Sequence, residues 1–150
     1  MNKSKVLIFV LLVSCGHKTE LLDEKNKLLA INEEQRTAHM TNDAQMLVRS
    51  MADSLISVDS GNISINSKEQ VQNRFKNYFS MVKYVEWDDL SEPFIQISND
   101  GSLATMSVKK RTITLDNSGI PDTTIFAWTS AFKRIGDDWK MFSITSTNRH

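Results

Sequence analysis

The chain has 150 residues, in which 18 lysines and arginines balance 18 aspartates and glutamates, and it contains a single cysteine. This length fits one domain. The single cysteine excludes an internal disulfide, and the near-neutral charge argues against nucleic-acid binding, which calls for a basic face. Two early lysines, Lys3 and Lys5, precede a short apolar run over residues 6–13. A membrane-spanning helix needs about 20 apolar residues, so this pattern predicts a secretory signal over residues 1–14.

The predicted signal ends in the residues LVSC at positions 12–15. They resemble the lipobox of bacterial lipoproteins, which has a leucine three positions before the cysteine and a small residue directly before it. The resemblance implies cleavage after residue 14 and diacylation of the Cys15 thiol, so that Cys15 is a membrane anchor without a redox or catalytic role. The mature chain would carry a charge of 16 − 18, or −2. An ordinary signal peptide and a cytosolic protein with an apolar start are the alternatives.

The residues after the cysteine bear on localisation. Gly16, His17 and Lys18 follow, with no aspartate beside Cys15 and no acidic run. By resemblance to lipoprotein sorting, this favours the periplasmic face of an outer membrane.

Two helices are predicted before the main strands. Residues 19–51 have a helical pattern, which is cleanest at Met40, Ala44, Leu47, Val48 and Met51. We expect residues 15–32 to form either a tether or an extension of this helix, and residues 33–150 to form the domain. A short hairpin is predicted over residues 55–65, with its turn at DSGN. Ser67 then starts a second helix, because Gln70 completes a capping box. Its buried face is predicted to carry Val71, Phe75, Tyr78, Phe79 and Val82.

The rest of the chain has the pattern of four long strands. They are predicted over residues 84–97, 103–115, 123–135 and 139–147, with turns at NDG, at a looser Gly- and Pro-containing loop and at Gly136. Pro93 should interrupt the first of them, because proline cannot donate to a strand ladder. Strands this long must bend. The predicted fold class is therefore α+β, with a strongly bent antiparallel sheet forming a cone around helices on its inner face.

This order of elements resembles the nuclear transport factor 2-like (NTF2-like) superfamily, and in particular its SnoaL-like branch. The resemblance covers about residues 33–147. It rests on RTAHMTNDAQML, ADSLISVDSGNI, SKEQVQNRFKNYF and the closing FAWTSAFKRIGDDWKMFSI. It implies a cone-shaped cavity, and in many relatives a dimer formed through the open sheet face. It does not specify an activity, because one scaffold carries many functions.

Three residues are the candidates for acid–base chemistry. His39 and Asp43 are four apart on the first predicted helix, so that Asp43 could orient the imidazole. The alternative is a surface pair worth roughly 0.2–0.5 kcal/mol. Asp89 lies on the first long strand and could point into the cone as a base with a raised pKa. The alternative is a solvated strand edge.

Three further residues are candidates for ligand contact. Trp87 should share a strand face with Asp89, while Trp128 and Ser130 should share one with Phe126 and Phe132. Such an aromatic face could line an apolar pocket or simply pack in the core. The neighbouring run Lys109-Lys110-Arg111 is predicted to be a solvated strand end, with an anion or lipid-headgroup contact as the alternative.

No cofactor or metal is expected. The sequence has no phosphate-binding loop, and His17, His39 and His150 fit no metal-ligand spacing. The favoured function is a lipid-anchored envelope protein that binds a small apolar ligand or a protein partner without catalysis. A cofactor-free isomerase, cyclase or hydrolase and a dimeric scaffold are the alternatives.

Overall fold

A computed structural model describes residues 13–149, which form three helices and seven strands. The helices are α1 (Val13–Met40), α2 (Ala44–Leu47) and α3 (Lys68–Phe79). The strands are β1 (Met51–Asp59), β2 (Asn62–Ser67), β3 (Val82–Asp89), β4 (Phe94–Ile97), β5 (Leu103–Asp116), β6 (Pro121–Ile135) and β7 (Asp138–Arg149). The predicted signal segment lies outside the described residues, except for its last two positions. Within the described part, no helix is long and apolar enough to cross a membrane.

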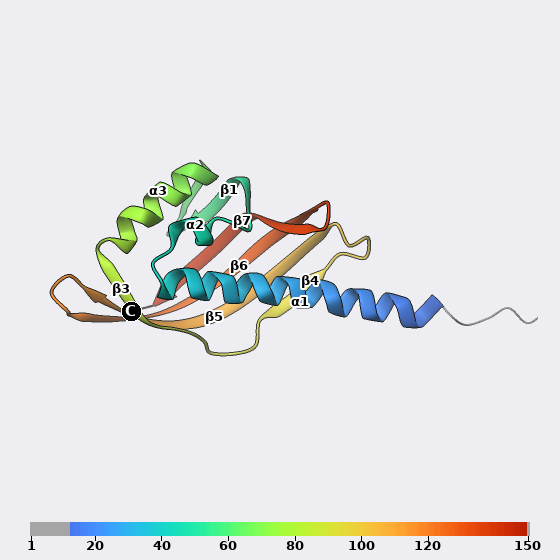
Figure 1. Cartoon of the computed structure of the whole chain (residues 1–150), viewed down its shortest axis with the longest axis horizontal. Helices are drawn as coiled ribbons and strands as arrows, with labels where there is room; N and C mark the ends of the chain where they lie inside the picture. The colour runs from blue at the N-terminus through green and yellow to red at the C-terminus, as the bar shows by residue number, and fades with distance from the viewer. Residues whose placement is uncertain (1–12, 150) are drawn as a thin grey trace, which may run out of the picture.

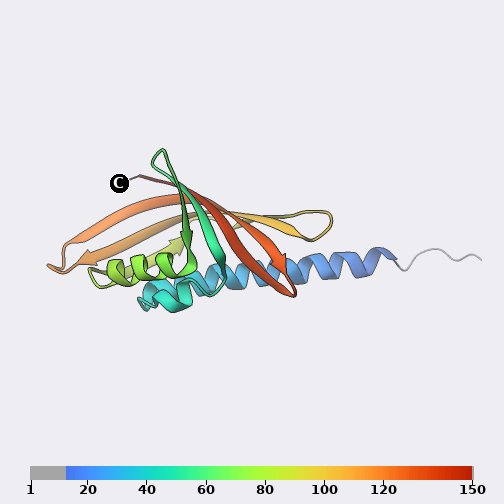
Figure 2. The same ribbon diagram turned by 90° about the horizontal axis from the view of Figure 1, so that it is seen from above.

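The strands form one bent sheet in the order β2-β1-β7-β6-β5-β3, and β4 also pairs with β5. All three helices lie on its inner, concave side, as Figures 1 and 2 show. The predicted α+β class and the bent sheet are therefore confirmed. The sheet is mixed rather than purely antiparallel, because β1 pairs in parallel with β7. This contact joins the first hairpin to the last strand and produces a single seven-stranded sheet.

Several local predictions agree with the structure. Ser67 caps α3 and Gln70 completes its capping box. Both central residues of the β1–β2 turn, Ser60 and Gly61, have positive φ, as a tight hairpin turn requires. The first long strand is divided at Pro93 into β3 and β4, which pair with successive parts of β5.

The first helix ends earlier than predicted. It stops at Met40, because Asn42 adopts a left-handed conformation with φ of 54°. The Asn42 side chain donates hydrogen bonds to the carbonyl oxygens of Phe79 (2.8 Å) and Val82 (3.0 Å). The prediction of one helix as far as Met51 is therefore wrong: a tertiary contact stabilises a break that helical periodicity does not reveal.

At its other end, α1 is continuous through residues 15–32. This segment is therefore an extension of the helix and not a separate tether. The extension also packs on the domain. Glu24 is buried, accepts a hydrogen bond from the Trp139 indole (2.7 Å) and lies 3.3 Å from the guanidinium of Arg134. Leu28 is completely buried. The packed domain thus begins before residue 33.

The core lies between the helices and the inner face of the sheet. Its buried apolar side chains include Leu28, Leu47, Met51, Leu55, Val71, Phe79, Tyr84, Trp87, Met106, Phe132, Trp139 and Met141. Along β5, the buried positions alternate from Ala104 to Thr114 and change from apolar to polar at Lys110. The candidate site lies at this change.

Candidate functional site

His39 lies in the last turn of α1, and aromatic rings surround its imidazole. The ring stacks on Trp87, with ring centres 4.7 Å apart and an interplanar angle of 20°. Tyr84, Phe79 and Phe75 meet it edge-on, with ring centres at 5.2, 5.6 and 6.0 Å. Sequence spacing alone does not predict this enclosure, because the rings come from α3 and β3.

The enclosure determines the charge of His39. Its Nδ1 atom donates a hydrogen bond of 2.7 Å to the carbonyl oxygen of Gln35. Removal from water lowers the pKa of His39 to about 4, and the nearby positive charge of Lys110 acts in the same direction. The imidazole is therefore neutral at pH 7.

Asp43 does not orient His39. Its side chain accepts hydrogen bonds from the backbone N–H groups of Gln45 and Met46, both at 2.9 Å, and so caps α2. The two residues are four apart in sequence, but the left-handed turn at Asn42 interrupts the helix between them. The proposed His39–Asp43 pair is thus absent. The Asn42-Asp43 sequence was the available signal, since these residue types favour helix ends and N-caps.

Asp89 forms the centre of a second cluster. It accepts hydrogen bonds from Lys110 and from the side-chain amide of Asn32, the latter at 3.0 Å. The Asp89 side chain is 28% exposed, whereas that of Lys110 is completely buried. The Lys110 ammonium also lies 3.9 Å from the centre of the Trp87 ring, within the range of a cation–π interaction. No hydrogen bond joins Asp89 to His39.

The solvated strand end predicted for Lys110 is wrong. Strand alternation sends Lys109 and Arg111 outward and Lys110 inward, and the same alternation in the sequence could have indicated this. Burial lowers the pKa of the Lys110 ammonium, while its hydrogen bond and charge interaction with Asp89 offset part of that effect. In the Asp89 cluster, sequence reasoning missed Asn32 and placed Lys110 in solvent.

The three predicted ligand-contact residues differ in accessibility. Trp87 is buried, at 2% exposure, and so is Ser130. Trp128 is partly buried, and its ring centre is 5.8 Å from that of Trp87 and 6.4 Å from that of Phe126. Trp128 and Phe126 are therefore the more accessible residues of this aromatic face.

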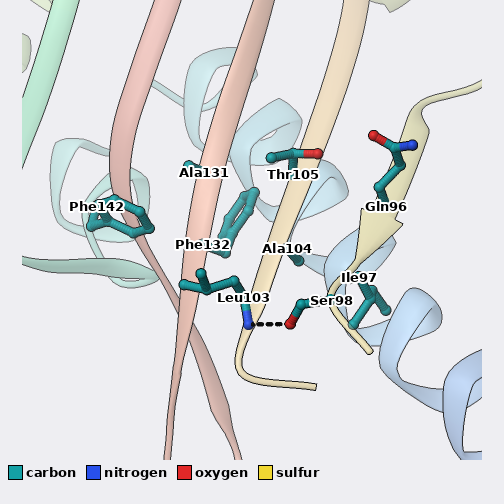
Figure 3. Close-up of a pocket in the computed structure, with 9 residues that line it drawn as sticks. All are labelled: Gln96, Ile97, Ser98, Leu103, Ala104, Thr105, Ala131, Phe132 and Phe142. Atoms are coloured by element: carbon teal, nitrogen blue, oxygen red, sulfur yellow. Dashed lines mark hydrogen bonds between the residues drawn. The ribbon is translucent and has the colours of Figure 1, made fainter. Parts of the chain in front are cut away.

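Two hollows lie away from this cluster. One, of about 290 Å³, lies over β4 to β7 and is largely apolar; Figure 3 shows its lining residues Gln96, Ile97, Ser98, Leu103, Ala104, Thr105, Ala131, Phe132 and Phe142. The other, of about 570 Å³, lies between α3 and the turn that joins α1 to α2. Neither is lined by His39, Trp87 or Trp128. Among the side chains that the structure describes, those of residues 20–149, no three His, Cys, Asp or Glu gather as metal ligands would.

The geometry of the chain matches several solved structures. A protein of unknown function in nutrient uptake from Rhodospirillum rubrum, described as NTF2-like, superposes with a TM-score of 0.66 at 20% identity, covering 82% of this chain and 98% of that one. The fold is NTF2-like. A ketosteroid isomerase-like protein from Erwinia carotovora atroseptica has the same architecture (TM-score 0.67, 10% identity, 83% and 95% coverage). So does an NTF2-like protein with a cystatin-like fold from Novosphingobium aromaticivorans (TM-score 0.68, 12% identity, 87% and 85% coverage).

At these identities the NTF2-like structures define the fold and not the activity. No protein-family model and no curated protein matches the sequence. The assignment to the SnoaL-like branch remains a prediction.

Proposed function

We propose that the protein is a lipid-anchored cell-envelope protein whose NTF2-like cone binds a small apolar ligand without catalysis. One observation supports the proposal that binding occurs without catalysis. The side chains considered for acid–base chemistry have other partners: His39 binds a backbone carbonyl, Asp43 caps α2, and Asp89 is held by Lys110 and Asn32. No two of these three side chains converge on each other, whereas Trp128 and Phe126 offer an aromatic surface next to the buried Lys110 ammonium.

The lipobox resemblance at Cys15 supports the anchor, and its predicted location is the periplasmic face of an outer membrane. The test is a Cys15→Ser variant beside Ser14→Gly, which keeps a small residue before the cysteine. Cys15→Ser should leave the membrane fraction and take up no labelled fatty acid, while Ser14→Gly should behave like the wild type. Absence of label from the wild-type protein would contradict the anchor.

Tryptophan emission tests the ligand site. Sterols, fatty acids and aromatic polyketides would be screened by emission and thermal shift. A ligand at the proposed site should change the emission of the wild type and of Trp139→Phe, because Trp139 lies in the β6–β7 hairpin. The change should disappear in Trp128→Phe. A response that survives in Trp128→Phe, or no response to any compound, would contradict this site.

A homodimer is a second proposal, favoured by exposed isoleucines on one face of the β1–β2 hairpin. Ile63 and Ile65 are 75% and 72% exposed, and Ile65 lies opposite Ile56. Exposed apolar patches of this kind commonly mark interaction sites. Light scattering after size-exclusion chromatography should give a dimer mass that Ile63→Lys abolishes and Ser64→Lys, on the opposite strand face, preserves. A monomeric wild type would contradict this proposal.

A further inference from the structure

The larger of the two hollows has walls from two distant parts of the chain. One wall is the segment that joins α1 to α2, residues 41–45, and the other is a row of side chains on α3. Gln72, Lys76 and Phe79 form this row, because spacings of four and three residues place side chains on one side of a helix. Figures 1 and 2 show α2 beside α3. The volume of about 570 Å³ is in the range of pockets that bind small molecules.

Asn42 joins the two walls and has one acceptor left over. Its amide nitrogen, Nδ2, donates to the carbonyl oxygens of Phe79 and Val82, which fixes the orientation of the side chain. Its amide oxygen, Oδ1, is buried and has no hydrogen-bond partner in the described part of the chain. A buried acceptor without a partner lowers stability. Because Asn42 lines the hollow, an N–H group of a ligand there would supply the missing donor.

Opposite charges stand on the two walls. Asp43 accepts two backbone hydrogen bonds through Oδ1, whereas its other carboxylate oxygen, Oδ2, has no partner among the described residues. The Lys76 ammonium likewise forms no ion pair or hydrogen bond within residues 20–149. Both side chains line the hollow and no ion pair joins them, so each charge is available to a ligand that lies between the walls.

The remaining lining is suited to an amide backbone. The side-chain amides of Gln45 and Gln72 line the hollow and have no hydrogen-bond partner among the described residues. Each of these amides offers both a donor group and an acceptor. The ring of Phe79, which is 6% exposed, adds an apolar surface. A ligand that fits this lining has a cation at one end, an anion at the other and amide groups between them.

We propose that this hollow binds a short peptide in its zwitterionic form. The terminal ammonium lies at Asp43, the terminal carboxylate lies at Lys76, and a backbone N–H group is directed at Oδ1 of Asn42. The amides of Gln45 and Gln72 then pair with the backbone C=O and N–H groups of the peptide. Side chains hold the ligand, because the N–H groups of residues 45 and 46 at the start of α2 are already bound by Asp43.

This site is separate from the other proposed contacts of the protein. Its ligand is polar and charged, whereas the ligand proposed for the surface at Trp128 is apolar. Trp128 does not line the hollow. The peptide site therefore depends neither on that surface nor on the anchor at Cys15, and each is tested independently.

Calorimetric titration of the full-length protein with trialanine measures the binding. Asp43→Asn removes the negative charge but retains the cap, because asparagine caps a helix as well as aspartate does. Lys76→Gln removes the positive charge at an exposed position. Each change should weaken binding at least about tenfold, because a hydrogen bond to a charged group is lost. Asp53→Asn and Lys83→Gln make the same charge changes at exposed positions outside the hollow, and should leave the affinity unchanged.

Two further measurements locate the peptide and identify the recognised groups. In an NMR titration, the side-chain amide signals of Gln45 and Gln72 should shift, while that of Gln96, which lines the other hollow, should not. N-acetyl-trialanine amide, which lacks both terminal charges, should bind at least about tenfold more weakly than trialanine.

Each contrary result refutes the proposal. Absence of binding at millimolar trialanine excludes the peptide. Binding without shifts at positions 45 and 72, or binding that is unchanged in Asp43→Asn and Lys76→Gln, places the peptide elsewhere. Equal affinity for the end-blocked peptide shows that the two charges are not recognised.

Discussion

Replacement of His39 by phenylalanine should remove most of the acid sensitivity of the fold between pH 6.5 and pH 4.5. A phenyl ring can retain the stacking on Trp87 but cannot take up a proton. In the wild-type protein the aromatic enclosure lowers the pKa of His39 from 6.5 to about 4. The unfolded chain therefore binds a proton in this pH range that the folded protein does not.

The sign and size of the effect follow from linkage. Because the folded-state pKa is depressed, the stabilisation is fully present above pH 6.5 and decreases as the pH falls toward 4. A difference of 6.5 − 4, or about 2.5 pH units, at about 1.36 kcal/mol per unit gives about 3 kcal/mol. About 2.5 kcal/mol of this should be lost by pH 4.5. The carboxylates with lowered pKa values, Glu24 and Asp100, contribute mainly below that pH.

Urea unfolding at pH 7, 6, 5 and 4.5, followed by tryptophan fluorescence, measures the effect. The free energy of unfolding should decrease in the wild type as the pH is lowered from 7 to 4.5, and should remain nearly constant in His39→Phe. The variant can be less stable at pH 7, because it loses the hydrogen bond to Gln35, without changing this expectation. An NMR titration of the histidine ring protons gives the pKa directly. Parallel pH profiles for the two proteins, or a pKa of His39 near 6.5, would refute the reasoning.

Two further variants test the packing of the helices. Glu24→Gln should lower the free energy of unfolding by about 1–3 kcal/mol, because a buried charged acceptor is lost. The control Asp23→Asn, at an exposed position, should change it little. Similar urea midpoints for the two variants would contradict the buried contact of Glu24. Phe79→Ala should lower the free energy of unfolding by about 3–5 kcal/mol, and Asn73→Ala, at an exposed position, should lower it by well under about 1 kcal/mol. Equal shifts in melting temperature for the two variants would refute the orientation of α3.

The site shows where local patterns cease to be informative. Strand periodicity correctly places Trp128, Ser130 and Phe132 on one face of β6. It cannot identify the partners of that face, because a strand pattern contains no information about remote segments. Lys110 on β5 is another such case: the carboxylate that compensates its burial belongs to Asp89 on β3, and Asn32 on α1 donates a hydrogen bond to that same carboxylate.

The sequence by itself determined the features that depend on neighbouring residues: the capping box at Ser67, the tight turn at Gly61, the division of the strand at Pro93 and the bent α+β architecture that these elements build. A cap, a turn or a proline break acts within a few residues, so its signal lies in a short stretch of chain. Only the tertiary structure decided the parallel pairing of β1 with β7, the end of α1 and the neutral state of His39. The physical reason is that burial and charge compensation are properties of surfaces brought together from distant parts of the chain, and they outweigh the local preference of any single residue.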